Sequence, residues 1–109
     1  MENKIAFLAD LLEKVKTGEK TETRRMFKKF ETGDIIKAYS RTDSNDFAMI
    51  KCVNVYDDYL LNITEDQAKK EGCKSRQDFL NLWDSINMKL KINSKDNPKV
   101  CVIKFERID

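Results

Sequence analysis

The run Phe47-Ala48-Met49-Ile50-Lys51-Cys52-Val53-Asn54-Val55-Tyr56 is the most informative stretch of this chain. Its residues fall into two alternating sets, one of which includes Ala48, Ile50 and Cys52. Successive side chains of a strand point to opposite faces of the sheet. An alternating run of this length therefore predicts a bent strand that turns one face toward a core.

Two further strands are indicated before this run. Asp34–Arg41 contains apolar residues and begins at the turn signal Thr32-Gly33-Asp34, while the polar residues 42–46 are expected to form a loop. Lys20–Arg25 is short, polar and partly β-branched, which fits either a strand or a turn.

The first residues of the chain carry a helical pattern. Residues 4–17 place apolar side chains on one helical face, at Ile5, Leu8, Leu11, Leu12 and Val15. Asn3 fits an N-cap, and Gly18 fits the left-handed residue that ends many helices. An alternative is that the first few residues form a short strand before a shorter helix.

Two helices and a strand are predicted after the central run. Thr64-Glu65-Asp66-Gln67 matches a capping box, which predicts a short helix to about Lys70, ended by Gly72. A second helix is expected to start at Ser75-Arg76-Gln77-Asp78. Its apolar face would be formed by Phe79, Leu82, Trp83 and Ile86. Apolar residues then predict a last strand, at Val100, Val102, Ile103 and Phe105.

The order of these elements is a helix, strands, two helices and a strand. Because the strands are not each followed by a helix, a doubly wound parallel sheet is disfavoured. We therefore predict an α+β fold, a small mixed sheet or partly closed barrel with helices packed at its side. The 109 residues fit a single domain, 1–109.

Composition excludes several classes of site. The chain has no histidine, and its three cysteines lie far apart, which argues against a zinc site and against histidine-based catalytic triads. Cys52 and Cys101 lie in apolar runs and are interpreted as buried thiols. We expect no metal and no cofactor.

The same features bear on location. Free thiols suggest a reducing compartment. The N-terminus lacks the pattern of a signal peptide, and no run is long enough to span a membrane. A cytoplasmic monomer without a membrane partner is the expectation.

Net charge is only +2, so the distribution of charge carries more information than the total. The densest positive segment runs from Lys20 to Lys29 against the single acid Glu22, and its basic residues are Lys20, Arg24, Arg25, Lys28 and Lys29. Arg and Lys side chains bind phosphate through charge-assisted hydrogen bonds. Phe27 and Phe30 are interleaved with them and suit base stacking, although packing in the core is the commoner role.

Gly18-Glu19-Lys20-Thr21-Glu22-Thr23-Arg24-Arg25 resembles the G-x-K-T-x-T-x-R signature of ASCH domains, which are PUA-like barrels. The similarity continues at Gly33-Asp34, at Ile63–Ala68, at Glu71-Gly72 and in the last strand. This resemblance implies a PUA-like fold with a cleft that binds RNA or nucleosides, lined by the Lys-Thr-Arg segment and the Glu-Gly turn.

Some small members of that family are amidohydrolases that remove the acetyl group of N4-acetylcytidine, and the resemblance places their catalytic residues at Lys20, Thr23 and Glu71. In this chemistry Thr23 attacks the acetyl carbonyl, Lys20 takes its proton if burial and nearby cations lower the Lys pKa, and Glu71 orients Lys20 or carries the proton. Side chains three apart on a regular strand face opposite ways, so the chain must turn between Lys20 and Thr23.

Three functions remain open from the sequence. The first is binding of RNA or a modified nucleoside, with Arg24, Arg25, Lys28 and Lys29 as nucleic-acid contacts. The second is the amidohydrolase, and the third is a metal-independent ribonuclease assisted by Lys20 and Arg25. A protein-interaction adaptor is compatible with the same sequence. Arg24 stands where those amidohydrolases carry a hydrophobic residue, which favours a phosphate-bearing ligand.

Overall fold

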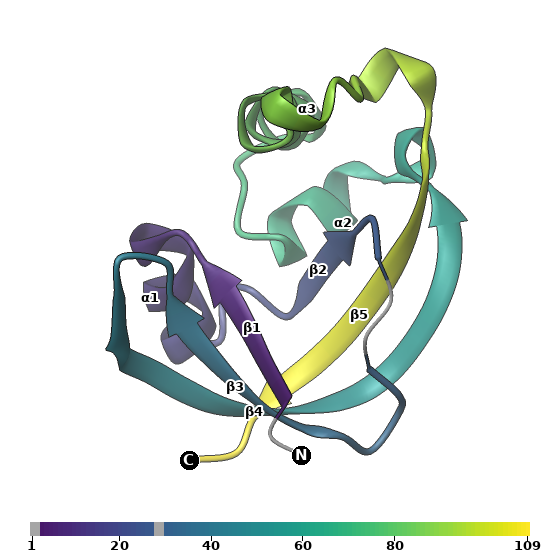
Figure 1. Cartoon of the computed structure of the whole chain (residues 1–109). Helices are drawn as coiled ribbons and strands as arrows, with labels where there is room; N and C mark the ends of the chain where they lie inside the picture. Colours follow the sequence, from purple (N-terminus) through teal and green to yellow (C-terminus); the bar gives the residue numbers. More distant parts are fainter. Residues whose placement is uncertain (1–2, 28–29) are drawn as a thin grey trace.

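The alternating run at residues 47–56 lies within β4 (Asp43–Tyr59), at the centre of a five-stranded sheet in the computed structural model (Figure 1). The structure describes residues 3–27 and 30–109. β4 pairs antiparallel with β3 (Ile35–Ser40) and with β5 (Lys99–Arg107). A register shift between Cys52 and Asn54 marks a bulge, which confirms the predicted bend.

The two remaining strands form the edges of the sheet. β1 (Asn3–Phe7) pairs parallel with β3, and β2 (Glu22–Arg25) pairs antiparallel with β5, which gives the strand order β1-β3-β4-β5-β2. The sheet curls into a half-barrel with three helices packed alongside, so its two edges face each other (Figure 1). The predicted α+β, PUA-like fold is confirmed.

The N-terminal segment follows the alternative interpretation. Residues 4–17 are not one helix, because β1 comes first and α1 spans only Ala9–Thr17 after an N-cap at Leu8, not Asn3. Ile5 and Phe7 are buried from a strand, and strand and helix periods cannot be separated over so few residues. Gly18 adopts φ +86° and ends the helix as predicted.

The loop predicted at 42–46 is wrong for most of its length. β4 begins at Asp43, which pairs with Ser40, so only two residues separate the strands of this hairpin. Residues 43–45 are polar because they are exposed. Polar residues are common both in loops and on exposed strands, and here they belong to an exposed strand.

Two helices lie between β4 and β5. Thr64 and Gln67 form the predicted capping box of α2 (Glu65–Lys70), and Ser75 caps α3 (Arg76–Ile86). Short 3₁₀ turns complete the connections, at Leu60–Asn62, Met88–Leu90 and Ser94–Asp96. No helix in the described part of the chain is long and apolar enough to cross a membrane.

The hydrophobic core has two parts. One lies between α1 and the sheet and includes Leu12, Ile36 and Cys52, and the other lies beneath α2 and α3 and includes Leu60, Phe79 and Trp83. Cys52 and Cys101 are buried, as predicted. Charged side chains are also buried, at Lys20, Glu22, Arg24 and Glu71, and they mark the candidate site.

Gly72 allows a test of how tightly the helical insert is joined to α1. It has φ +95°, and a Cβ atom there would lie 3.2 Å from Cδ of Lys14, whereas Gly18, at φ +86°, has open space around it. We expect Gly18→Ala to cost about 1–2 kcal/mol through backbone strain alone. Gly72→Ala should cost a further ~1–3 kcal/mol through crowding, measured by urea denaturation. Equal losses in both variants would contradict tight packing at this junction.

Candidate functional site

Lys20 is held between α1 and β2 by a complete set of hydrogen bonds. Its Nζ donates to the carbonyl oxygens of Glu22 (2.9 Å) and Glu71 (2.7 Å) and to Oε1 of Glu71 (2.9 Å). Lys20 and Glu71 are 3% and 4% exposed. Burial lowers the pKa of Lys20, and the Glu71 carboxylate opposes that change. The two carbonyls and Oε1 of Glu71 together give each of the three N–H groups of the ammonium an acceptor.

Arg24 joins the same network from the strand. Its Nη1 donates to Oε1 of Glu22 at 3.1 Å and to Oε2 of Glu71 at 2.8 Å. Glu22 and Arg24 are two residues apart on β2 and so share one face of the strand. Two cations, Lys20 and Arg24, are thus balanced by two carboxylates in a nearly water-free site, which is the condition for charges to remain buried.

Arg25 behaves differently. Its Nε donates to Oγ1 of Thr23 at 3.0 Å, its Nη2 donates to the carbonyl of Ala6 at 2.8 Å, and its guanidinium lies 5.0 Å from the centre of the Phe7 ring. These contacts bridge the β2 and β1 edges of the half-barrel. Burial lowers the pKa of Arg25, with Glu71 opposing. Among the described residues no carboxylate forms an ion pair with it, and Nη1 has no hydrogen-bond acceptor.

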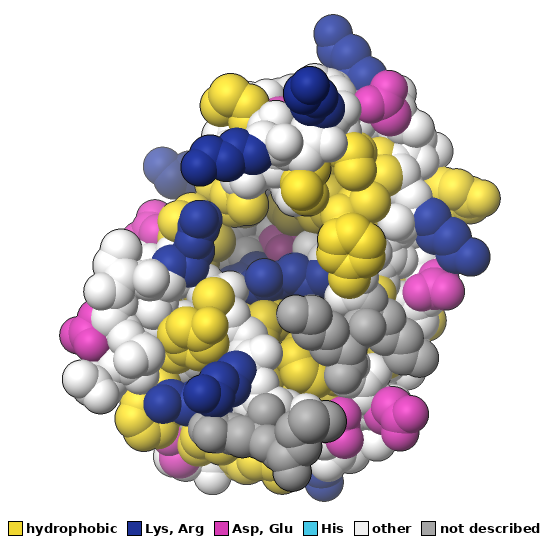
Figure 2. Space-filling model, viewed as in Figure 1, with side chains coloured by type: hydrophobic (Ala, Val, Ile, Leu, Met, Phe, Trp, Pro, Cys, Tyr) yellow, Lys and Arg dark blue, Asp and Glu magenta, His cyan; other side chains and the backbone are white. Residues whose placement is uncertain are grey.

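A cavity of about 430 Å³ opens between the two edges and the helical insert. Figure 2 shows the hollow with basic side chains at its floor and hydrophobic side chains around it. Lys20, Thr23 and Glu71 all line this cavity, as do Arg24 and Arg25. The chain leaves α1 at Gly18 and enters β2 only at Glu22, and this turn removes the opposite-face problem for Lys20 and Thr23.

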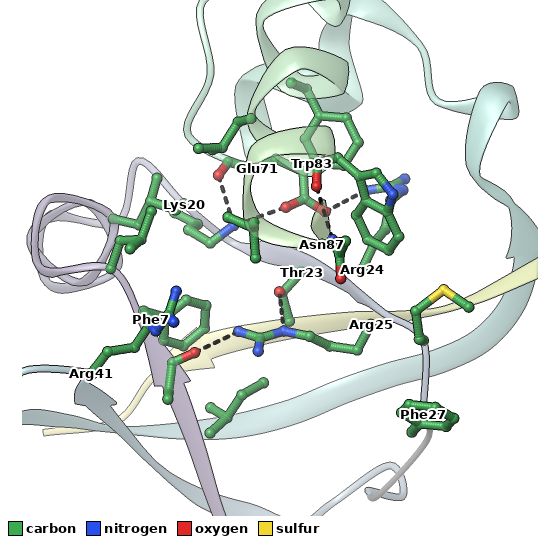
Figure 3. A pocket seen from close by; sticks show the side chains of 18 of the residues that line it. Phe7, Lys20, Thr23, Arg24, Arg25, Phe27, Arg41, Glu71, Trp83 and Asn87 are labelled. Atoms are coloured by element: carbon green, nitrogen blue, oxygen red, sulfur yellow. Dashed lines mark hydrogen bonds and ion pairs between the residues drawn. The ribbon is translucent and has the colours of Figure 1, made fainter. Parts of the chain in front are cut away.

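Lys20 and Thr23 line the same cavity, but in the part of the chain that the structure describes no hydrogen bond joins their side chains. Thr23 Oγ1 instead accepts from Arg25 (Figure 3). Lys28 and Lys29, two predicted nucleic-acid contacts, lie outside the described residues. Phe30 is buried in the core as expected, whereas Phe27 is 69% exposed at the edge of the cavity, so its core interpretation is wrong. Phe27 lies two residues beyond the end of β2 and so has no place in the sheet.

Several residues of the cavity were not singled out from sequence, including Phe7, Arg41 and Asn87. Asn87 donates from Nδ2 to the Trp83 carbonyl at 3.0 Å, which orients its amide, and Oδ1 accepts no hydrogen bond from the residues that the structure describes. Figure 3 shows Asn87 directed into the cavity from the end of α3, across from Arg25. An asparagine after a helix is common, so the sequence offered no signal for this position.

Solved structures share this fold, and ASCH domains are among them. No protein-family model matches the sequence, and no curated protein matches it. A DUF984-family protein from Enterococcus faecalis superimposes with a TM-score of 0.79 and 16% identity, over 100% of this chain and 77% of that chain.

Two ASCH structures are similar in the same way. The ASCH domain from Lactobacillus crispatus gives a TM-score of 0.74 at 16% identity, over 96% of this chain and 79% of that chain. ASCH from Zymomonas mobilis gives 0.68 at 12% identity, over 98% and 70% of the two chains. At these identities the likeness establishes the fold, and the fold is the one predicted from the Gly18–Arg25 signature.

The buried network can be tested through Glu71. Glu71→Gln keeps the shape of the side chain but leaves Lys20 and Arg24 with a single carboxylate, so we expect the free energy of unfolding to fall by about 3–5 kcal/mol. Asp57→Asn is a matched control, because Asp57 pairs with Lys99 at an exposed site and should matter by less than about 1 kcal/mol. Urea denaturation followed by circular dichroism measures both. A Glu71→Gln variant as stable as the unaltered protein would refute the structural role.

Proposed function

We propose that this chain binds RNA, or a nucleoside derived from it, with one nucleotide unit in the cavity. The observation that carries the proposal is the arrangement at Arg25, a cation whose remaining N–H donors face a cavity with aromatic walls. Among the described residues, Lys20 and Arg24 form ion pairs with Glu22 and Glu71 and Arg25 forms none, so the charge of Arg25 is available to an anionic or strongly polar ligand. Nη2 of Arg24, which is buried and has no hydrogen-bond acceptor in the described part of the chain, is a second donor at the same cavity.

The shape and lining of the cavity support the same class of ligand. A volume of about 430 Å³ falls within the usual range for small-molecule sites. Phe7 and Trp83 supply apolar surface for a base, and Oδ1 of Asn87 supplies an acceptor for a base N–H. Arg41 at the edge adds a second positive charge for the backbone. The resemblance of Gly18–Arg25 to the ASCH signature favours RNA or a nucleoside as well.

Arg25 is the residue to change first. We expect Arg25→Ala to raise the Kd for a short single-stranded RNA by about ten- to a hundredfold, because hydrogen bonds to a charged group are lost. The slope of log K against log salt should also fall by about one. Fluorescence anisotropy across a salt series measures both quantities.

Two controls accompany that measurement. Lys51→Ala removes an exposed lysine of β4 that does not line the cavity, and it should leave the affinity nearly unchanged. Since Arg25 also bridges β1 and β2, Arg25→Lys keeps the charge while losing the forked geometry, and it should bind with intermediate affinity. Equal affinity in Arg25→Ala, Arg25→Lys and the unaltered protein would reject the proposal.

A second candidate is hydrolysis of N4-acetylcytidine, favoured by the hydrogen bond from Arg25 to Thr23. An N–H directed at Oγ1 turns the hydroxyl proton away and eases its removal, after which Oγ1 attacks the acetyl carbon and the negative charge passes to the carbonyl oxygen. Lys20 could accept that proton only as a neutral amine, and losing its own proton first would also cost it one of its three hydrogen bonds. In this scheme Glu71 would hold Lys20 in place and offset its charge.

Thr23→Val tests this candidate. Valine keeps the shape of threonine without the nucleophilic oxygen, so we expect deacetylation of N4-acetylcytidine to disappear while the fold is retained. Thr21→Val is the matched control, because Thr21 does not line the cavity. Mass spectrometry of the products measures turnover, and incubation with short RNAs in a chelating buffer would reveal the fragments expected of a metal-independent ribonuclease. Full turnover by Thr23→Val would eliminate the threonine mechanism.

A further inference from the structure

An apolar rim borders one side of the cavity. Phe27, Ile86 and Leu90 line the opening and are 69%, 43% and 50% exposed, and Met88 beside them is 72% exposed. Large apolar side chains grouped at the edge of a pocket are a recognised sign of a binding surface. The residues around this rim indicate what kind of ligand it binds.

Phe27 is the aromatic member of this rim. It follows the end of β2, and the neighbouring core is filled by Phe30, which is 4% exposed. The ring of Phe27 therefore does not contribute to the packing of the half-barrel. The exposed ring of Phe47 differs in this respect, because Nζ of Lys37 lies over it at 4.6 Å. An exposed ring next to a cavity that receives a base offers a stacking platform for a second base.

The positions of the cations indicate the direction of the ligand. In Figure 3, Phe27 lies on one side of the cavity and Arg41 on the other, with Arg25 and Thr23 between them. A strand that crosses the opening would meet a stacking surface, an interior cation and an outer cation in turn. An apolar peptide on the same rim would leave the charges of Arg25 and Arg41 without a counter-charge.

We propose that Phe27 stacks on the base adjacent to the nucleotide held in the cavity, so that the ligand is a single-stranded oligonucleotide and not a free nucleoside. This inference rests on the proposed function, because it requires a nucleotide in the cavity. A single strand is implied because bases in a duplex are already stacked on their neighbours and cannot offer a face to Phe27.

The test measures the contribution of the second base. Affinity is compared for a cytidine–adenosine dinucleotide, in both linkage orders, and for the same dinucleotides lacking the adenine base. In the unaltered protein we expect the better-bound order to exceed its abasic counterpart by about fivefold or more. Phe27→Ala should bring this ratio close to one, whereas Phe27→Trp should preserve it.

Met88→Ala is the matched control, since it removes a comparably exposed apolar side chain that does not line the cavity, and it should keep the ratio. A ratio that is unchanged in Phe27→Ala, or absent in the unaltered protein, overturns the stacking role and would direct attention to a protein partner for the rim. Cytidine monophosphate distinguishes the two proposals. If it binds in an Arg25-dependent manner while the ratio is absent, only the stacking inference fails; if neither it nor any dinucleotide binds, the proposed function fails.

Discussion

The carboxylate of Glu71 is the interaction on which the site depends. One oxygen binds the ammonium of Lys20 and the other binds the guanidinium of Arg24, in surroundings that water does not reach. Buried charges are stable only when paired, so this bond fixes the end of α2 against β2. The walls of the cavity come from both sides of that junction, with Trp83 and Asn87 from α3 and Arg25 from the sheet.

Neighbouring basic residues of one segment therefore have different roles. Lys20 and Arg24 form ion pairs with Glu22 and Glu71 and hold the architecture together, whereas Arg25 lines the cavity without a carboxylate partner among the described residues. A count of positive charges along the chain treats all of them as equal. Only the pairing of each charge in space separates those that support a pocket from those that can bind a ligand within it.

The sequence predicted local features well and long-range ones poorly. The capping box at Thr64 and the alternating residues of β4 follow from contacts between near neighbours, and both are confirmed. The start of β4 at Asp43, the shortened α1 and the exposure of Phe27 depend on what the rest of the chain covers, which composition does not record. The resemblance of Gly18–Arg25 to a family signature predicted that Lys20, Thr23 and Glu71 lie together, and all three line one cavity.

The sheet is a half-barrel, and the side chain of Arg25 links its β2 edge to its β1 edge through the Ala6 carbonyl. The same side chain can also allow the two edges to separate, because a ligand that attracts the guanidinium competes directly with that carbonyl. Ligand binding and the separation of the two edges are therefore thermodynamically linked: a ligand that draws Arg25 away from the carbonyl favours separated edges, and the bond to Ala6 opposes binding. Under the proposed function, the arginine that binds the ligand is also the residue that joins the two edges of the sheet.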